Sequence, residues 1–212
     1  LVRGDVVVDV QSGYADYLDL VRNMNINGSL IVDVREGFEV NGRYSCFAGG
    51  HVEKDVIMDL HNAYENTEVA QDDFSALRDM NVAGDVTIVV DGGNYDEVRA
   101  IYGSESSVPS RYIGGKLDLT VKNVDARLMR MVYCGAIVRD DVKITVDNIT
   151  TGEFVGVLDS EITENFEMTI KNSTLGYDNI TDTYSADNSY LFGRTLLGKG
   201  AKVDINNTAT TN

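Results

Sequence analysis

The chain has 212 residues and a formal net charge of -16, because 34 Asp and Glu residues outnumber 18 Lys and Arg residues. This acidic balance argues against binding to nucleic acid or to anionic membranes, both of which attract basic patches. No apolar stretch is long enough to span a bilayer, so we expect no membrane insertion. The length allows one continuous core, and we expect a single domain over residues 1–212.

An alternation of apolar and polar residues recurs eight times, at intervals of 24 to 35 residues. Each occurrence has three apolar residues at alternate positions, which share one face of a strand because side chains alternate between the two faces. The triplets are 6/8/10, 30/32/34, 56/58/60, 86/88/90, 117/119/121, 142/144/146, 166/168/170 and 201/203/205. One supersecondary unit repeated at this period is the signature of a solenoid.

The outward positions of these strands alternate in charge from one repeat to the next. One row reads Asp118, Lys143, Glu167, Lys202, and another reads Asp91, Lys122, Asp147, Lys171. Opposite charges attract when they lie on neighbouring strands, so the alternation predicts parallel stacking of each strand on the next repeat's strand. An eight-strand sandwich gives no reason for this alternation. A leucine-rich horseshoe would need a recurrent Leu and Asn scaffold, which is absent.

Each repeat also carries a second apolar segment and a short third one. The second segments lie at 17–20, 45–49, 98–103, 131–135, 154–157 and 190–193, and the third ones at 24–26, 80–82, 136–138 and 161–162. Three short strands per turn of about 25 residues predict an all-β fold. Specifically, we expect a right-handed parallel β-helix solenoid of about seven to eight coils, with insertions at 104–111 and 172–188.

Three outward carboxylates, Asp9, Asp33 and Asp59, stack on the first three coils about 4.8 Å apart. Arg35 and His61 flank them on the same face. Our first interpretation is an acidic strip screened by water. The second is a calcium site, because calcium favours clusters of oxygen ligands, and calcium is the one cofactor we consider. The third is glycoside chemistry, which uses paired carboxylates at such separations.

Beside the acidic strip lies an apolar outward row of Val7, Ile31 and Ile57. Apolar residues in a row on an outward face indicate that something covers them. We therefore predict an interface here, covered by a terminal segment, a long turn or a neighbouring subunit.

The two cysteines, Cys46 and Cys134, fall in the second segments of coils two and five. Three coil steps put them about 14 Å apart, so we expect free thiols and no disulfide. Five Asn-x-Ser/Thr sequons are possible glycan acceptors on a secreted protein, although an Asn- and Thr-rich chain also produces them by chance. They begin at Asn27, Asn148, Asn172, Asn179 and Asn206.

The two ends of the predicted solenoid have exposed strand edges. The first strand begins by residue 5, the last ends by residue 206, and no amphipathic capping helix flanks them. Exposed strand edges need caps, so we expect either excised flanking coils or pairing with other copies. End-to-end pairing without rotational closure would build a filament. Because the chain begins at Leu1 without a signal peptide, we expect a processed product or an excerpt.

Residues 85–95, Asp-Val-Thr-Ile-Val-Val-Asp-Gly-Gly-Asn-Tyr, followed by Ala-Ile-Tyr-Gly at 100–103, form a strand-Gly-Gly-turn-strand-Tyr-Gly unit. This unit resembles the right-handed β-helix regions of large bacterial and archaeal surface and adhesin-like proteins. Segments 47–50, 133–135 and 192–193 echo its second half. The resemblance implies a secreted protein with a scaffolding or adhesive role.

We therefore expect an extracellular structural or adhesive β-helix, which associates with copies of itself end to end or laterally and meets a carbohydrate or host-surface ligand. The motifs of pectin-degrading β-helix enzymes do not occur in order, so we expect no enzyme and assign no catalytic residue. One alternative is a carbohydrate-active β-helix that uses Asp9, Asp33 and Asp59. A calcium-stabilised binding module is the other.

Overall fold

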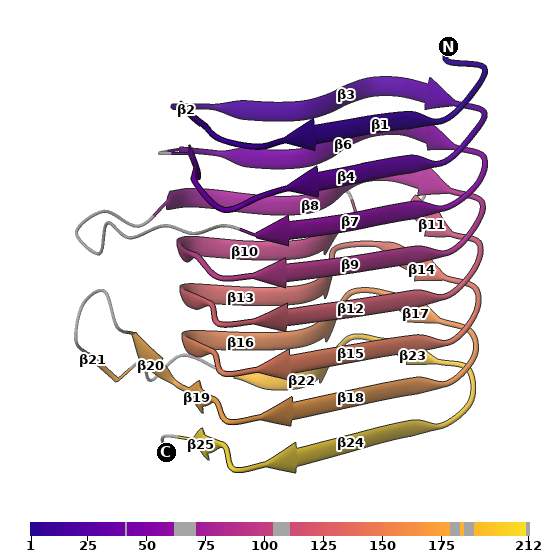
Figure 1. Cartoon of the computed structure of the whole chain (residues 1–212). Coiled ribbons are helices and arrows are strands. Elements are labelled where there is room, and N and C mark those ends of the chain that lie inside the picture. The colour runs from indigo at the N-terminus through magenta and orange to yellow at the C-terminus, as the bar shows by residue number, and fades with distance from the viewer. Residues whose placement is uncertain (41, 62–70, 104–110, 179–182, 185–188, 211–212) are drawn as a thin grey trace.

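The computed structural model describes residues 1–40, 42–61, 71–103, 111–178, 183–184 and 189–210. Every regular element in these ranges is a β-strand, and the strands wind into the parallel β-solenoid shown in Figure 1. The described ranges hold no helix with the length and apolarity that crossing a membrane requires. The predicted fold class is confirmed.

The first sheet has eight parallel strands, one from each repeat, stacked from the N-terminal to the C-terminal end of the solenoid (Figure 1). They are β1 (Val6–Val10), β4 (Leu30–Val34), β7 (Val56–His61), β9 (Val86–Asp91), β12 (Leu117–Lys122), β15 (Val142–Asp147), β18 (Phe166–Lys171) and β24 (Ala201–Asn206). Every pairing has the register predicted from the apolar triplets, beginning with Val6 on Leu30 and Leu30 on Val56.

The second sheet has 13 strands and contains the other two segments of each repeat. The second segments form β3 (Leu18–Ile26), β6 (Tyr44–Val52), β8 (Gln71–Val82), β10 (Asn94–Tyr102), β13 (Asp125–Tyr133), β16 (Thr150–Leu158), β19 (Thr174–Leu175), β22 (Tyr190–Gly193) and β25 (Ala209–Thr210). The third segments form β11 (Arg111–Ile113), β14 (Ala136–Val138), β17 (Glu161–Ile162) and β23 (Leu196–Leu197).

Two small sheets complete the described fold. β2 (Gly13–Ala15) pairs with β5 (Phe38–Val40) in parallel, and β20 (Tyr177–Asp178) pairs with β21 (Thr183–Tyr184) antiparallel.

The structure differs from the sequence prediction in two details. In the first three coils the second and third segments join into the single long strands β3, β6 and β8. In the next coil these segments are two separate strands, since β10 ends at Tyr102 and β11 begins at Arg111, and β11 pairs with β8 only at Val82. The solenoid has about six turns, slightly fewer than the seven to eight expected.

The core runs along the inside of the solenoid. The inward triplets of the six middle strands of the first sheet are all buried. An aromatic stack fills the N-terminal half, with ring centroids 6.3 Å apart for Phe38 and Tyr44 and 5.3 Å apart for Tyr44 and Phe74. Phe74 lies a further 5.3 Å from Tyr95. These rings supply much of the apolar burial between coils.

An asparagine ladder closes the turn after the first sheet. Its members all have positive φ: Asn123 at 57°, Asn148 at 54°, Asn172 at 52° and Asn207 at 47°. The Asn148 amide donates to Asn123 Oδ1 at 2.8 Å, and the Asn207 amide donates to Asn172 Oδ1 at 2.8 Å. Asn172 donates to Asp147 at 3.0 Å, and this bond, with the contact from Lys171, lowers the pKa of Asp147. Asparagine combines tolerance of left-handed backbone with side-chain hydrogen bonding.

We expect Asn148→Ala to lower the free energy of unfolding by about 2 kcal/mol, because it loses a hydrogen bond and because alanine lacks the polar side chain with which asparagine stabilises left-handed backbone. Asn148→Gly is the matched control, since glycine loses the same bond without the steric penalty. Urea unfolding followed by circular dichroism measures both variants. If both variants lost the same free energy of unfolding, left-handed backbone would carry no extra cost for alanine at this turn.

A carboxylate ladder closes the turn that precedes the first sheet. An Asp side chain of one coil accepts a hydrogen bond from a backbone amide of the next. The pairs are Asp5 with Ser29 N (2.8 Å), Asp55 with Asp85 N (2.9 Å) and Asp85 with Lys116 N (2.8 Å). A β-carbon at Gly84 or Gly115 would lie 2.3 or 2.1 Å from the neighbouring Asp oxygen, so glycine is required beside the ladder.

Candidate binding face

The acidic strip lies on the outward face of β1, β4 and β7. Asp9 pairs in register with Asp33, and Asp33 pairs in register with Asp59. The next position along this row is Val89 on β9, which interrupts the run of carboxylates. The predicted juxtaposition of the three carboxylates is therefore present on the outer surface of the first three coils.

Each carboxylate of the strip has a cationic or ionisable neighbour. Arg35 Nε lies 3.7 Å from Asp9 Oδ1, and Arg35 Nη2 lies 3.4 Å from Asp33 Oδ2. His61 Nε2 lies 3.1 Å from Asp59 Oδ1. The three Asp side chains are 41–55% exposed, so water screens these contacts strongly. This geometry fits a solvated strip whose negative charge Arg35 offsets only in part.

Calcium binding and catalysis by Asp9, Asp33 and Asp59 stay predictions. In the part of the chain that the structure describes, no group of three or more His, Cys, Asp or Glu side chains is arranged to hold a metal ion.

Two neighbouring rows of charged residues extend from beside the strip toward the C-terminal end. Asp91 lies 3.5 Å from His61 and 3.0 Å from Lys122, and Asn123 donates to it at 2.6 Å. Burial alone would raise the pKa of Asp91, but the hydrogen bonds from Asn123 and Lys122 outweigh burial and lower it. Further alternating pairs are Lys171 with Asp147 (3.0 Å), Lys202 with Glu167 (2.7 Å) and Lys143 with Asp118 (4.0 Å).

The apolar row Val7, Ile31 and Ile57 is also in register on the same three strands. Val7 is 68% exposed and Ile57 is 46% exposed, while Ile31 between them is half-buried, so no described segment of this chain covers the whole row. A cover supplied by a described terminal segment or turn is therefore absent. A neighbouring subunit as the cover stays a prediction.

A buried ionic cluster on the second sheet was not anticipated from the sequence. Its centre is Glu97, whose side chain is 6% exposed and forms ion pairs with both Arg99 and Arg130. Arg99 also lies 3.4 Å from Asp73, and Arg130 lies 3.4 Å from Glu153. Burial alone would lower the pKa of Arg99, but Glu97 and then Asp73 raise it. An alignment of the second segments would have placed these charges in neighbouring coils.

The remaining predicted residues are placed as follows. Cys46 is buried, and burial raises the pKa of its thiol to about 12, which keeps it protonated and unreactive. Cys134 is half-buried and forms no disulfide. Asn27, Asn148, Asn172 and Asn206 are exposed, while Asn179 lies outside the described residues. The amides of Asn148 and Asn172 already donate within the asparagine ladder, and glycosylation of the sequons stays a prediction.

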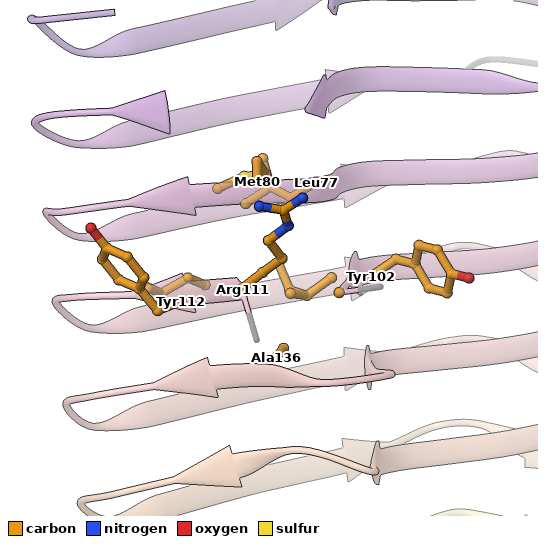
Figure 2. Close-up of a pocket in the computed structure, with 9 residues that line it drawn as sticks. Leu77, Met80, Tyr102, Arg111, Tyr112 and Ala136 are labelled. Atoms are coloured by element: carbon orange, nitrogen blue, oxygen red, sulfur yellow. The ribbon is translucent and has the colours of Figure 1, made fainter. Parts of the chain in front are cut away.

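The predicted insertions lie mainly outside the described residues, at 104–110, 179–182 and 185–188. Figure 2 shows a small cavity where β10 ends and β11 begins, with Arg111 beside it and Tyr102 and Tyr112 on opposite sides. Its volume of about 10 Å³ suits roughly one water molecule. Arg111 Nε is buried and has no hydrogen-bond partner in the described ranges, so it is a suitable donor to such a water.

Comparison with known proteins returns no matching family model, no matching curated protein and no matching solved structure. Function must therefore be inferred from the arrangement of the side chains themselves.

Proposed function

We propose that this chain is an extracellular structural protein of adhesive type, a β-solenoid rod that stacks end to end on copies of itself. One hydrophobic core runs through the stacked coils. Charged side chains on the outward faces pair between coils, as Lys122 does with Asp91 and Lys171 does with Asp147. Continuous packing and paired surface charges support a rigid scaffold rather than a catalyst.

The observation that carries the proposal is the match between the two edge strands of the first sheet, β1 and β24. The inward residues of β24 are incompletely covered, and Ile205 is 51% exposed. The inward residues of β1 are only half-buried. Both strands have the same inward phase, so β24 of one copy can pair with β1 of another in the register that joins consecutive coils. Such head-to-tail contacts do not close and build a filament.

Stacking would also bring the acidic strip to the junction. Asp204 occupies the same row of the sheet as Asp9, so a stacked copy would add a fourth carboxylate to the strip. Like charges on adjacent strands repel, and oxygen ligands attract calcium. We therefore expect calcium or added salt to favour stacking.

An extracellular location is supported by the five sequons and by the resemblance to adhesin-like β-helices. Adhesion to a carbohydrate or host-surface ligand is part of the same proposal.

The test is electron microscopy and light scattering of the purified 212-residue chain with and without calcium. We expect filaments for the unmodified chain and monomers for Ile205→Lys, which puts a charge on the exposed β24 edge. Ile57→Lys is the matched control, because Ile57 is similarly exposed on the side of the rod. It should leave filaments intact.

If Ile57→Lys lost the filaments and Ile205→Lys kept them, the contact between copies would be a lateral one through the apolar row and not an end-to-end one. Monomers of the unmodified chain under all conditions would overturn self-association.

A further inference from the structure

Arginine side chains line a hollow on β3, β6 and β8, the first three strands of the second sheet in Figure 1. Arg22, Ala48 and Arg78 are in register on these strands. The residues that follow them are Asn23, Gly49 and Asp79, all with positive φ. The middle coil therefore has two small residues where the coils on either side have an arginine and a polar side chain.

The two small residues leave a hollow between the neighbouring arginines. Since adjacent strands lie about 4.8 Å apart, the backbones that carry Arg22 and Arg78 are separated by roughly 10 Å. The hollow has a volume of about 130 Å³ and is floored by Ala48 and Gly49. One water needs only about 10–15 Å³ by the same measure, so the hollow has room for a larger group.

The lining of the hollow is cationic in an otherwise acidic protein. Arg22, Arg43 and Arg78 face two carboxylates, Asp19 and Asp79, which leaves one excess positive charge. Arg22 Nη1 lies 3.1 Å from Asp19, Arg43 Nη2 lies 3.8 Å from Asp19, and Arg78 Nε lies 3.6 Å from Asp79. Each guanidinium has five N–H donors, so these contacts leave donors available. The three side chains are 62, 41 and 31% exposed, within reach of a ligand.

One polar atom of the lining is unsatisfied. Asp79 Oδ1 is buried and has no hydrogen-bond partner among the described residues. The oxygen itself is closed to a ligand, but the Asp79 side chain as a whole is 35% exposed, so rotation of the carboxylate would let it accept a ligand hydroxyl and remove the cost of the unpaired acceptor.

We propose that this hollow binds a carboxylate or sulfate group carried by a hydroxyl-bearing ligand, the chemistry of a sugar acid or a sulfated sugar. Arginine forks match the oxygen pairs of such anions, and Asp79 accepts a ligand hydroxyl. Repulsion from the net charge of -16 is largely screened beyond about 8 Å at physiological ionic strength. The site is independent of whether copies of the chain stack.

The test follows the arginine Nε–H resonances by NMR in three separate titrations. The ligands are glucuronate, which carries a carboxylate, N-acetylglucosamine 6-sulfate, which carries a sulfate, and glucose, which carries neither. We expect shifts of the Arg22, Arg43 and Arg78 signals with at least one anion and none with glucose. Saturation by the carboxylate alone or by the sulfate alone identifies the anion. The proposal would be overturned if glucose bound as tightly as the anions, or if neither anion shifted the arginine signals.

Variants separate the site from general surface charge. Arg22→Gln and Arg78→Gln should each weaken binding about tenfold or more, because each removes charged hydrogen bonds. Ala48→Leu fills the floor, retains all three arginines and should also block binding. Arg194→Gln is the matched control, since Arg194 is 78% exposed elsewhere on the rod. An equal loss in Arg194→Gln would show non-specific attraction instead of a site.

Discussion

Replacing Glu97 by alanine is expected to lower the free energy of unfolding by about 3–5 kcal/mol. Glu97 is the most buried member of the ionic cluster and pairs with Arg99 and Arg130, whose side chains are 20 and 18% exposed. Without Glu97, two poorly hydrated guanidiniums would face each other across neighbouring coils. Arg99 and Arg130 would keep only their 3.4 Å contacts to Asp73 and Glu153, so the charge of two partly buried guanidiniums would be poorly compensated. Urea unfolding followed by circular dichroism measures the loss.

The control for Glu97→Ala is Asp118→Ala. Asp118 lies 4.0 Å from Lys143, and both side chains are at least half exposed, so this change should alter stability by less than about 0.5 kcal/mol. If the two variants unfold at the same urea concentration, the Glu97 cluster contributes no more than a surface ion pair.

Phe74→Ala is expected to lower the free energy of unfolding by about 3–5 kcal/mol. Phe74 is fully buried at the centre of the aromatic stack, with Tyr44 and Tyr95 each 5.3 Å away. Truncation removes apolar contacts on both sides and leaves a cavity that β-strands fixed by their ladders cannot readily fill. The thermal unfolding midpoint and the urea midpoint should both fall.

Tyr17→Ala serves as the control for Phe74→Ala, because it removes an aromatic ring that is 74% exposed. Its effect should stay within about 0.5 kcal/mol. A Phe74→Ala protein as stable as this control would mean that neighbouring coils close the cavity without loss.

The fold could be predicted in detail because two kinds of pattern coincide. The apolar triplets specify which face of each strand is inside, and the alternating charges specify which strands are neighbours. Together they specified the register between coils, down to Asp9 beside Asp33 and Thr120 beside Thr145. A repeat makes this possible, because each unit contacts only its neighbours.

The turns were less predictable. The asparagine ladder depends on left-handed backbone at four positions, and the sequence signal was an Asn at the same offset after Lys122, Asp147, Lys171 and Asn206. Two of those residues, Asn148 and Asn172, were interpreted instead as sequons. A motif of three residues describes local chemistry, whereas the ladder is a contact between residues about 25 positions apart.

The sequence by itself determined the solenoid, its register and the rows of charge and apolar residues on the first sheet, because alternation along a strand and repetition between strands are both visible in one dimension. Only the tertiary structure decided that Glu97 is buried between two arginines and that Ala48 and Gly49 open a hollow between Arg22 and Arg78. Burial and open space depend on how the side chains of separate coils pack against one another. An alignment of the second segments places these residues in neighbouring coils, but it does not say how deeply each side chain is buried or how much space is left between them.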